Sequence, residues 1–208
     1  MEFVLVVPRN DLFVSFYPQG MLLEEEINLD EFLGRIKEKA FFIERRYTEK
    51  NPLYKQIIPY CLIIKPSTKE IFLMQRLETQ GEKRLHGKLS VGVGGHINPI
   101  DEMEGGNFLE IGLKREIEEE VVVEGEKGKH LIGIINDDSN PVGAVHFGLV
   151  YALLLDKQGN VEVREKHAMK GSLLPLEQVV EMCNNSTKFE SWSEAVLKRS
   201  KEWSKKFF

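Results

Sequence analysis

The stretch from Gly94 to Val123, GGHINPIDEMEGGNFLEIGLKREIEEEVVV, is the segment around which this chain is organised. Its second half predicts a helix, because Asn107 is a candidate N-cap and Glu110, three residues later, can close a capping box. Apolar residues then recur at every fourth position and form one stripe to bury, namely Leu109, Leu113, Ile117 and Val121.

Three carboxylates lie off that stripe, on another face of the same helix. Glu116, Glu119 and Glu120 stand at positions i, i+3 and i+4, so their side chains cluster. Acidic groups near a helix C-terminus oppose its macrodipole, at about 0.3–1 kcal/mol each, and like charges four residues apart add a similar penalty. One interpretation is a solvated acidic face. The other is a divalent cation site, because carboxylate oxygens suit Mg²⁺ or Mn²⁺.

The run Arg115–Glu120, REIEEE, resembles the R-E-U-x-E-E core of the Nudix hydrolases, where U is a bulky apolar residue. The full family pattern is G-x5-E-x7-R-E-U-x-E-E-x-G-U. Gly95 matches the opening glycine, and Asp101 stands where the family has glutamate. Thirteen residues separate Asp101 from Arg115, so the loop before the helix is six residues longer than in the pattern. Val122 replaces the late glycine.

The resemblance implies an α+β fold, a Nudix-type α/β/α sandwich with a mixed β-sheet, over residues 55–208. Residues 1–54 then form an N-terminal extension of strands and a helix, with the expected role of a cap on the main domain or a dimer contact. With this extension, the chain is similar to a bacterial Nudix group known as predicted phosphoesterases.

The same resemblance implies a chemistry. It is the Mg²⁺-dependent (or Mn²⁺-dependent) hydrolysis of a diphosphate linkage, in a nucleoside diphosphate joined to another moiety such as a sugar. Glu119 and Glu120 would hold the catalytic metal, and Gly95 would contribute its carbonyl. Glu116 would be a further metal ligand or a base. Arg115 would orient a glutamate through a salt bridge, with Asp101 as its candidate partner.

Other candidate residues lie outside this stretch. Two apolar runs, Ile57–Lys65 and Ile71–Arg76, predict a hairpin, and Arg76 resembles a family position that touches substrate phosphate. A surface arginine at a strand end is an equally good interpretation. The polar loop Thr79–Lys88 could flank a phosphate site or be plainly solvated. Glu162 and Glu165 resemble a late-loop base or ligand, but no motif anchors them.

Smaller features have a structural interpretation beside a functional one. Gly94 and Gly95 predict either a close backbone approach or a turn with positive φ. His96 is expected to be a hydrogen-bonded structural residue. Asp137 and Asp138 are expected to be a solvated turn, with lining of a substrate site as the minor alternative.

A non-catalytic nucleotide-binding sensor is the alternative function, because Asp101, Val122 and the longer loop depart from the family pattern. The intact carboxylates count against it. The isomerase branch that acts on isopentenyl diphosphate needs a catalytic cysteine in a characteristic setting, and Cys61 lies inside an apolar strand run.

The amino-acid composition limits the classes of partner that are expected. The 208 residues carry a net charge of −5 and no basic stripe, which argues against nucleic acid as a partner. Cys61 and Cys183 fit free thiols in a reducing compartment, so a cytoplasmic protein is expected. No apolar run approaches the length of a membrane span, and no signal peptide is expected. A homodimer is expected only from the resemblance to the Nudix hydrolases, many of which are dimers.

The remaining elements are expected from periodicity and turn signals. Asn28 predicts the N-cap of a helix, and Ser191 that of the last helix. The expected strands are Phe3–Val7, Leu12–Phe16, Val121–Glu124, Leu131–Ile135, Val142–Leu155 and Val161–Arg164, and the expected late helices are Leu174–Met182 and Trp192–Phe207.

Overall fold

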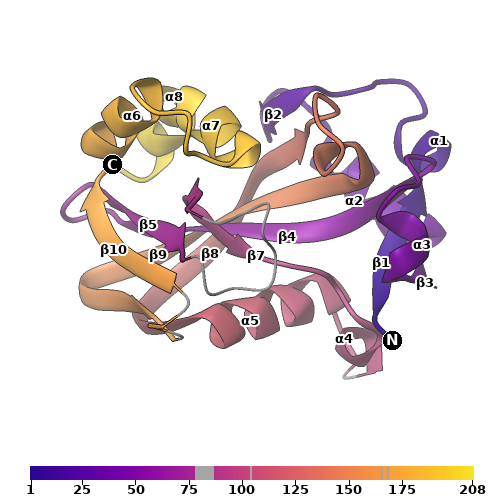
Figure 1. Cartoon of the computed structure of the whole chain (residues 1–208), viewed down its shortest axis with the longest axis horizontal. Helices are drawn as coiled ribbons and strands as arrows, with labels where there is room; N and C mark the ends of the chain where they lie inside the picture. The colour runs from indigo at the N-terminus through magenta and orange to yellow at the C-terminus, as the bar shows by residue number, and fades with distance from the viewer. Residues whose placement is uncertain (78–86, 104, 165, 168) are drawn as a thin grey trace. The chain divides into compact units, whose positions relative to one another are not determined.

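The structure is a computed structural model that describes residues 1–77, 87–103, 105–164, 166–167 and 169–208 (Figure 1). Its elements fall into two compact units, each built from segments that are separate in sequence. The first unit comprises Met1–Tyr60, Gly94–Arg115 and Leu131–Val150. The second comprises Cys61–Val93, Glu116–His130 and Tyr151–Phe208.

The strands are β1 (Phe3–Pro8), β2 (Gly20–Leu23), β3 (Phe41–Glu44), β4 (Tyr54–Lys65), β5 (Glu70–Arg76), β6 (Leu89–Ser90), β7 (Gly92–Gly94), β8 (Val121–Asn136), β9 (His146–Val163) and β10 (Met169–Pro175). The helices are α1 (Arg9–Leu12), α2 (Leu29–Lys39), α3 (Arg45–Thr48), α4 (Pro99–Met103), α5 (Phe108–Glu120), α6 (Leu176–Asn184), α7 (Ser191–Lys198) and α8 (Ser200–Trp203), with short 3₁₀ turns at Gly143–Val145 and Ser204–Lys206.

In the first unit, strands of the N-terminal extension pair with strands that follow it. β1 lies between β3 and the start of β4 (Figure 1), with Val4 opposite Ile43 and Val7 opposite Lys55. β2 pairs with the end of β8, where Met21 lies opposite Ile135. Because a strand pair buries backbone groups of both partners, the extension is part of the hydrogen-bonded framework of this unit.

Helix α2 covers the apolar side of this framework. Its N-cap is Asn28, as predicted, with the side-chain oxygen accepting from the Glu31 backbone N–H at 3.3 Å. Phe32 and Ile36, one turn apart, are the buried residues of the helix. Phe32 stacks on Phe147 of β9 at a centroid distance of 5.8 Å, so the extension shares an aromatic core with the later strand.

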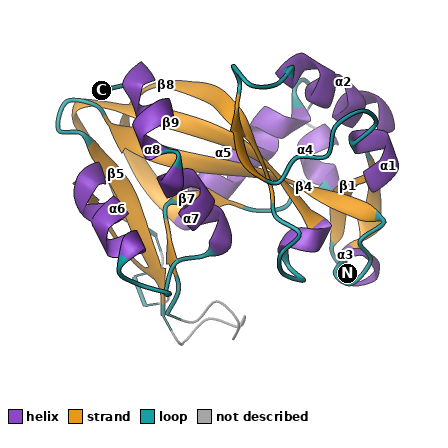
Figure 2. Cartoon of the chain, turned by 90° about the horizontal axis from the view of Figure 1, so that it is seen from above, coloured by secondary structure: helices purple, strands orange, loops and turns teal. Residues whose placement is uncertain are grey.

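In the second unit, β10 pairs antiparallel with β5 along its whole length, from Met169 opposite Arg76 to Pro175 opposite Glu70. Helix α6 packs against both strands, and it crosses β5 in Figure 2. The C-terminal helices close the unit around Trp203, which is fully buried and donates its indole N–H to the Val196 carbonyl at 3.0 Å.

Three expectations for the ends of the chain are wrong. Leu12–Phe16 is not a strand, because Leu12 ends the short helix α1 and β2 begins only at Gly20. The helix expected over Trp192–Phe207 breaks at Arg199 into α7 and α8. Ser191 is the first residue of α7 rather than its cap, since the N-cap is Glu190 and makes no side-chain cap bond.

The middle strands are longer than predicted. Val121–Glu124 and Leu131–Ile135 are parts of one strand, β8. The strands expected over Val142–Leu155 and Val161–Arg164 are joined in one strand, β9, which begins only at His146, after the 3₁₀ turn Gly143–Val145, and ends at Val163. The predicted hairpin of β4 and β5 is confirmed, with Ile64 opposite Ile71.

The α+β class with a mixed sheet is confirmed. Among the described residues, no helix combines the length and apolarity needed to cross a bilayer.

Candidate active site

Helix α5 presents the three predicted carboxylates as the sequence suggested. Leu113 and Ile117 on its apolar stripe are buried, whereas Glu119 is exposed and Glu116 and Glu120 are half-buried. The Leu109 backbone N–H donates to the Asn107 side chain at 3.2 Å, which confirms Asn107 as the cap of the helix.

Arg164 closes the C-terminal end of α5. Its backbone N–H donates to the Glu120 carbonyl at 2.9 Å, and its Nε donates to the Glu118 carbonyl at 2.7 Å. The last carbonyls of a helix otherwise lack partners, and a cation there complements the macrodipole. Arg164 therefore offsets part of the cost of an acidic helix end. No local sequence signal marks this residue, because its partners lie more than forty positions away.

The Arg115 side chain, one position before Glu116, is held by hydrogen bonds. Its Nε and Nη2 each donate to a carboxylate oxygen of Asp101 at 2.9 Å, and Nη2 also donates to the His96 carbonyl at 2.8 Å. Asp101 is only 1% exposed, and its Oδ2 also accepts the Asn98 backbone N–H at 2.8 Å. The candidate pairing of Arg115 with Asp101 is confirmed. Asp101 lies in the short helix α4, which precedes the lengthened loop.

Gly94, before the helix, lies at a close approach of two backbone segments. A Cβ on Gly94 would lie 1.9 Å from the Pro59 carbonyl oxygen, so no other residue fits there. Neither Gly94 nor Gly95 has a positive φ, so the alternative of a left-handed turn is wrong. Gly105 and Gly106 do have positive φ, at 73° and 101°, in the lengthened loop.

His96 does not stand alone. Its Nε2 lies 3.3 Å from Nε2 of His146, and the His146 Nδ1 lies 2.7 Å from the Val142 carbonyl. Burial lowers the pKa of His146, and it holds the pKa of His96 well below the ordinary value. Both rings are therefore neutral at pH 7.

Asp138 is the centre of a charged cluster rather than part of a solvated turn, so that expectation is wrong. Lys55, which is fully buried, donates to Asp138 Oδ1 at 2.7 Å and to the carbonyls of Gly143 and His146 at 3.0 and 3.2 Å. Arg9 donates to Asp138 Oδ2 at 2.9 Å, and the Tyr17 hydroxyl donates to the same oxygen. Burial lowers the pKa of Lys55 to about 8.

The remaining predicted residues are less well defined. The backbone of Arg76 ends β5 opposite Met169, but its side chain lies outside what the structure describes. Most of the loop Thr79–Lys88 and all of Glu165 also lie outside the described residues. Glu162 is exposed and pairs with Lys166 at 2.8 Å.

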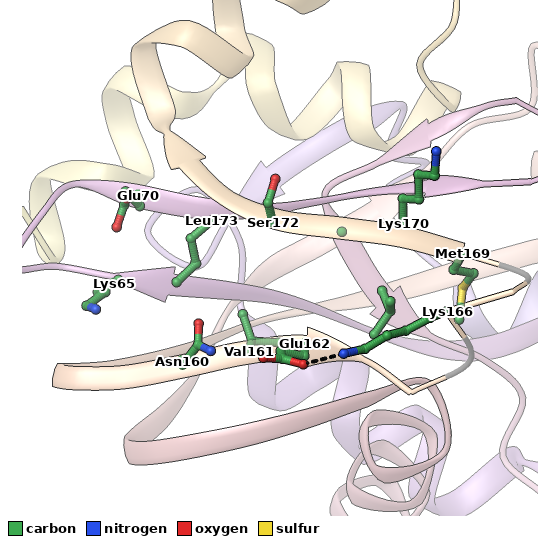
Figure 3. Close-up of a pocket in the computed structure, with 12 residues that line it drawn as sticks. Lys65, Glu70, Asn160, Val161, Glu162, Lys166, Met169, Lys170, Ser172 and Leu173 are labelled. Atoms are coloured by element: carbon green, nitrogen blue, oxygen red, sulfur yellow. Dashed lines mark hydrogen bonds and ion pairs between the residues drawn. The ribbon is translucent and has the colours of Figure 1, made fainter.

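A cavity of about 650 Å³ in the second unit contains none of the predicted catalytic or metal-binding residues. It lies between the end of β9 and β10, with the β4–β5 turn at one end (Figure 3). Val161 and Met169 are buried in its wall, and Lys166 pairs with Glu162 along its β9 side. Its chemistry is mixed, with an apolar wall and exposed charges of both signs.

The donor chemistry of α5 fits a hard divalent cation. Mg²⁺ keeps several water ligands and takes one or two protein carboxylates, which neighbouring glutamates on one helix face can supply. Among the described residues, no three His, Cys, Asp or Glu side chains already converge as a metal-binding group. The fit therefore depends on the kind of donor and its position on the helix, not on a preformed cage.

Comparisons with known proteins concern the sequence and the fold. No family model matches the sequence. Protein YmaB of Bacillus subtilis (strain 168) is 36% identical over 201 residues, in a match that covers 94% of this chain and 96% of YmaB. The crystal structure of Tm1382, described as a candidate Nudix hydrolase, has 27% identity and a TM-score of 0.75, and the match covers 95% of this chain and 97% of Tm1382.

A more distant likeness concerns the fold alone. The bifunctional NMN adenylyltransferase/ADP-ribose pyrophosphatase of Francisella tularensis, solved with AMP and a manganese ion, is 12% identical with a TM-score of 0.51. The match covers 72% of this chain and 42% of that protein.

Proposed function

Because the chain belongs to the Nudix superfamily, we propose that it is a metal-dependent hydrolase of a diphosphate linkage in a nucleoside diphosphate joined to another moiety. The observation that supports this most is the acidic face of α5, with Glu116, Glu119 and Glu120 in the family spacing and Arg115 anchored on Asp101. A helix that only served the fold would gain from fewer like charges at this end.

Each residue has a proposed role in this reaction. Glu119 and Glu120 would hold Mg²⁺ or Mn²⁺, the Gly95 carbonyl would add a ligand, and Glu116 would be a further ligand or a base. The bound cation would neutralise phosphate charge and acidify a water molecule. Arg115 would orient a glutamate through a salt bridge, and its guanidinium is bonded to Asp101. Arg76 binds substrate phosphate.

The proposal is tested by hydrolysis assays on a panel of nucleotides and nucleotide sugars, with Mg²⁺, Mn²⁺ or EDTA. We expect metal-dependent turnover of at least one compound. Glu119→Gln and Glu120→Gln should each lower kcat by about 10²-fold or more, because removal of a charge stabiliser costs several kcal/mol in the transition state. Glu118→Gln is the matched control, since it removes an exposed carboxylate on another side of the same helix and should leave kcat nearly unchanged.

Two results would contradict the proposal. If both Gln variants kept full activity, the carboxylates of α5 would not bind the catalytic metal. If no compound were hydrolysed while one bound saturably, the chain would be a nucleotide-binding sensor.

Light scattering tests the proposed homodimer, which should have about twice the chain mass of 23.9 kDa.

A further inference from the structure

We infer that Arg164 is a positioning residue for the glutamates of α5, because it closes the end of this helix where the Nudix pattern has a glycine and this chain has Val122. The inference rests on the proposed function, since it concerns the side chains that would hold the cation. Arg164, Glu119 and Glu120 all belong to the second unit.

The C-terminal end of α5 lacks the usual local cap. Helices commonly end with a glycine in the left-handed conformation, which brings backbone N–H groups back onto the last carbonyls. Val122 stands two positions after the last helical residue, Glu120, where that glycine is expected. A β-branched residue avoids positive φ, and among the described residues other than glycine only Lys69 has one. The chain passes directly from α5 into β8, so the last carbonyls need partners from elsewhere.

Arg164 supplies two of these partners. Its backbone N–H donates to the Glu120 carbonyl at 2.9 Å, and its Nε donates to the Glu118 carbonyl at 2.7 Å. Both donors belong to the residue that directly follows β9, and the end of β9 lies beside this end of α5 in Figure 1. Val163, the last residue of β9, is buried, so Arg164 follows a well-packed position.

The two bonds enclose the backbone that carries two of the glutamates. The Glu118 carbonyl belongs to the planar peptide that leads into Glu119, and the Glu120 carbonyl belongs to the peptide that leaves Glu120. The Cα atoms of Glu119 and Glu120 lie between these two peptides. Holding both peptides therefore limits fraying of the last turn and restrains the directions in which the two side chains leave the helix. Mg²⁺ and Mn²⁺ prefer octahedral geometry, so a frayed helix end would bind them less tightly.

The charge of Arg164 acts in the opposite direction. A guanidinium near carboxylates repels a divalent cation, so a purely electrostatic role predicts tighter metal binding when the charge is removed. Positioning predicts weaker metal binding when the Nε bond to the Glu118 carbonyl is removed. The two effects differ in sign, and they can be separated by variants that share the loss of charge.

Two neutral substitutions at this residue isolate the hydrogen bond. In Arg164→Gln, the side-chain amide nitrogen takes the place of Nε and can still donate to the Glu118 carbonyl. In Arg164→Met, a methyl group takes that place and donates nothing. Both variants keep the backbone bond to Glu120 and have the same net charge. The readout is the Mn²⁺ dissociation constant of the full chain without substrate, measured by electron paramagnetic resonance.

We expect Arg164→Met to bind Mn²⁺ about tenfold more weakly than Arg164→Gln, as is typical for loss of an outer-shell partner. Both variants should remain folded at room temperature by circular dichroism, so that the difference in affinity reports on the metal ligands and not on unfolding.

Equal or tighter Mn²⁺ binding in Arg164→Met than in Arg164→Gln would overturn the inference, provided that Glu120→Gln loses affinity. If Glu120→Gln kept the affinity of the wild type, or if the wild type bound no Mn²⁺, the proposed metal site itself would be wrong.

Discussion

At the scale of single residues, the strongest constraints come from charges that the fold has buried. Lys55 and Asp101 are almost completely inaccessible, yet each is bonded to oppositely charged or polar groups on all sides. Such groups contribute little net stability when paired, but they are costly when one partner is removed. They therefore determine which arrangement of the loops is allowed.

The pH dependence of stability should report on Lys55. Its pKa is about 8 in the folded chain and near 10.5 when exposed, so the unfolded chain binds more protons between these values. The free energy of unfolding should then rise with pH from about 8 to 10.5 through this group. Denaturant unfolding of wild type and Lys55→Met across this range measures it, and the variant should lack the rise. Parallel curves would show that Lys55 titrates normally.

Asp101→Ala should lower the free energy of unfolding by about 3 kcal/mol, because it leaves the Arg115 guanidinium without its buried carboxylate. Urea titration followed by circular dichroism gives this value. Glu102→Ala, at the exposed neighbouring position of α4, is the control and should change stability by less than about 0.5 kcal/mol. Similar losses in both variants would mean that the salt bridge contributes nothing specific.

Sequence reasoning identified Asp101 as the partner of Arg115 because both belong to one recognisable pattern. It missed the bonds from Arg9 and Lys55 to Asp138, which connect residues 129 and 83 positions apart. Nothing local in the sequence marks such pairs. The contact of His146 with His96 was missed for the same reason, since it joins residues fifty positions apart.

At the scale of elements, α5 was predicted well because its signals are local. The Asn107 cap determines where the helix begins, and the apolar residues at every fourth position determine which side it buries. The strands β8 and β9 were predicted as fragments. The polar segments in the middle of these strands, such as Glu124–Lys129, have the composition of loops. They form strand only where a neighbouring strand hydrogen-bonds their backbone groups.

Arg164→Ala should weaken the end of α5 specifically. It removes the Nε bond to the Glu118 carbonyl and the cation near the acidic helix end, a loss of about 1 kcal/mol. Hydrogen exchange should accelerate in the last turn of α5 and not in its first. Lys166→Ala, which breaks the exposed pair with Glu162, is the control. Uniform acceleration along the helix would contradict a local role for Arg164.

At the scale of the whole molecule, the N-terminal extension shares strand pairing and core contacts with the later residues. Strands β1 and β2 pair with β4 and β8, and Phe32 stacks on Phe147. The predicted boundary at residue 54 therefore separates segments that share hydrogen bonds and core.

We expect the fragment 55–208 to lack cooperative thermal unfolding when produced alone, because it loses the partner strands of β4 and β8. Calorimetry of the fragment and of the full chain measures this. Addition of a synthetic 1–54 peptide, as a complementation control, should restore part of the transition. A sharp transition of the fragment alone would establish the boundary at 54 as a true domain border.

The bonds from Arg164 to the end of α5 also bear on synthesis at the ribosome. All the proposed metal ligands precede residue 121, but the residue that closes their helix is made forty-four positions after Glu120. A nascent chain that has emerged only as far as β8 would display the acidic helix with its last carbonyls still open to water. The end of the helix is therefore completed only after β9 and Arg164 have been translated, so catalytic competence would appear late in the synthesis of each chain.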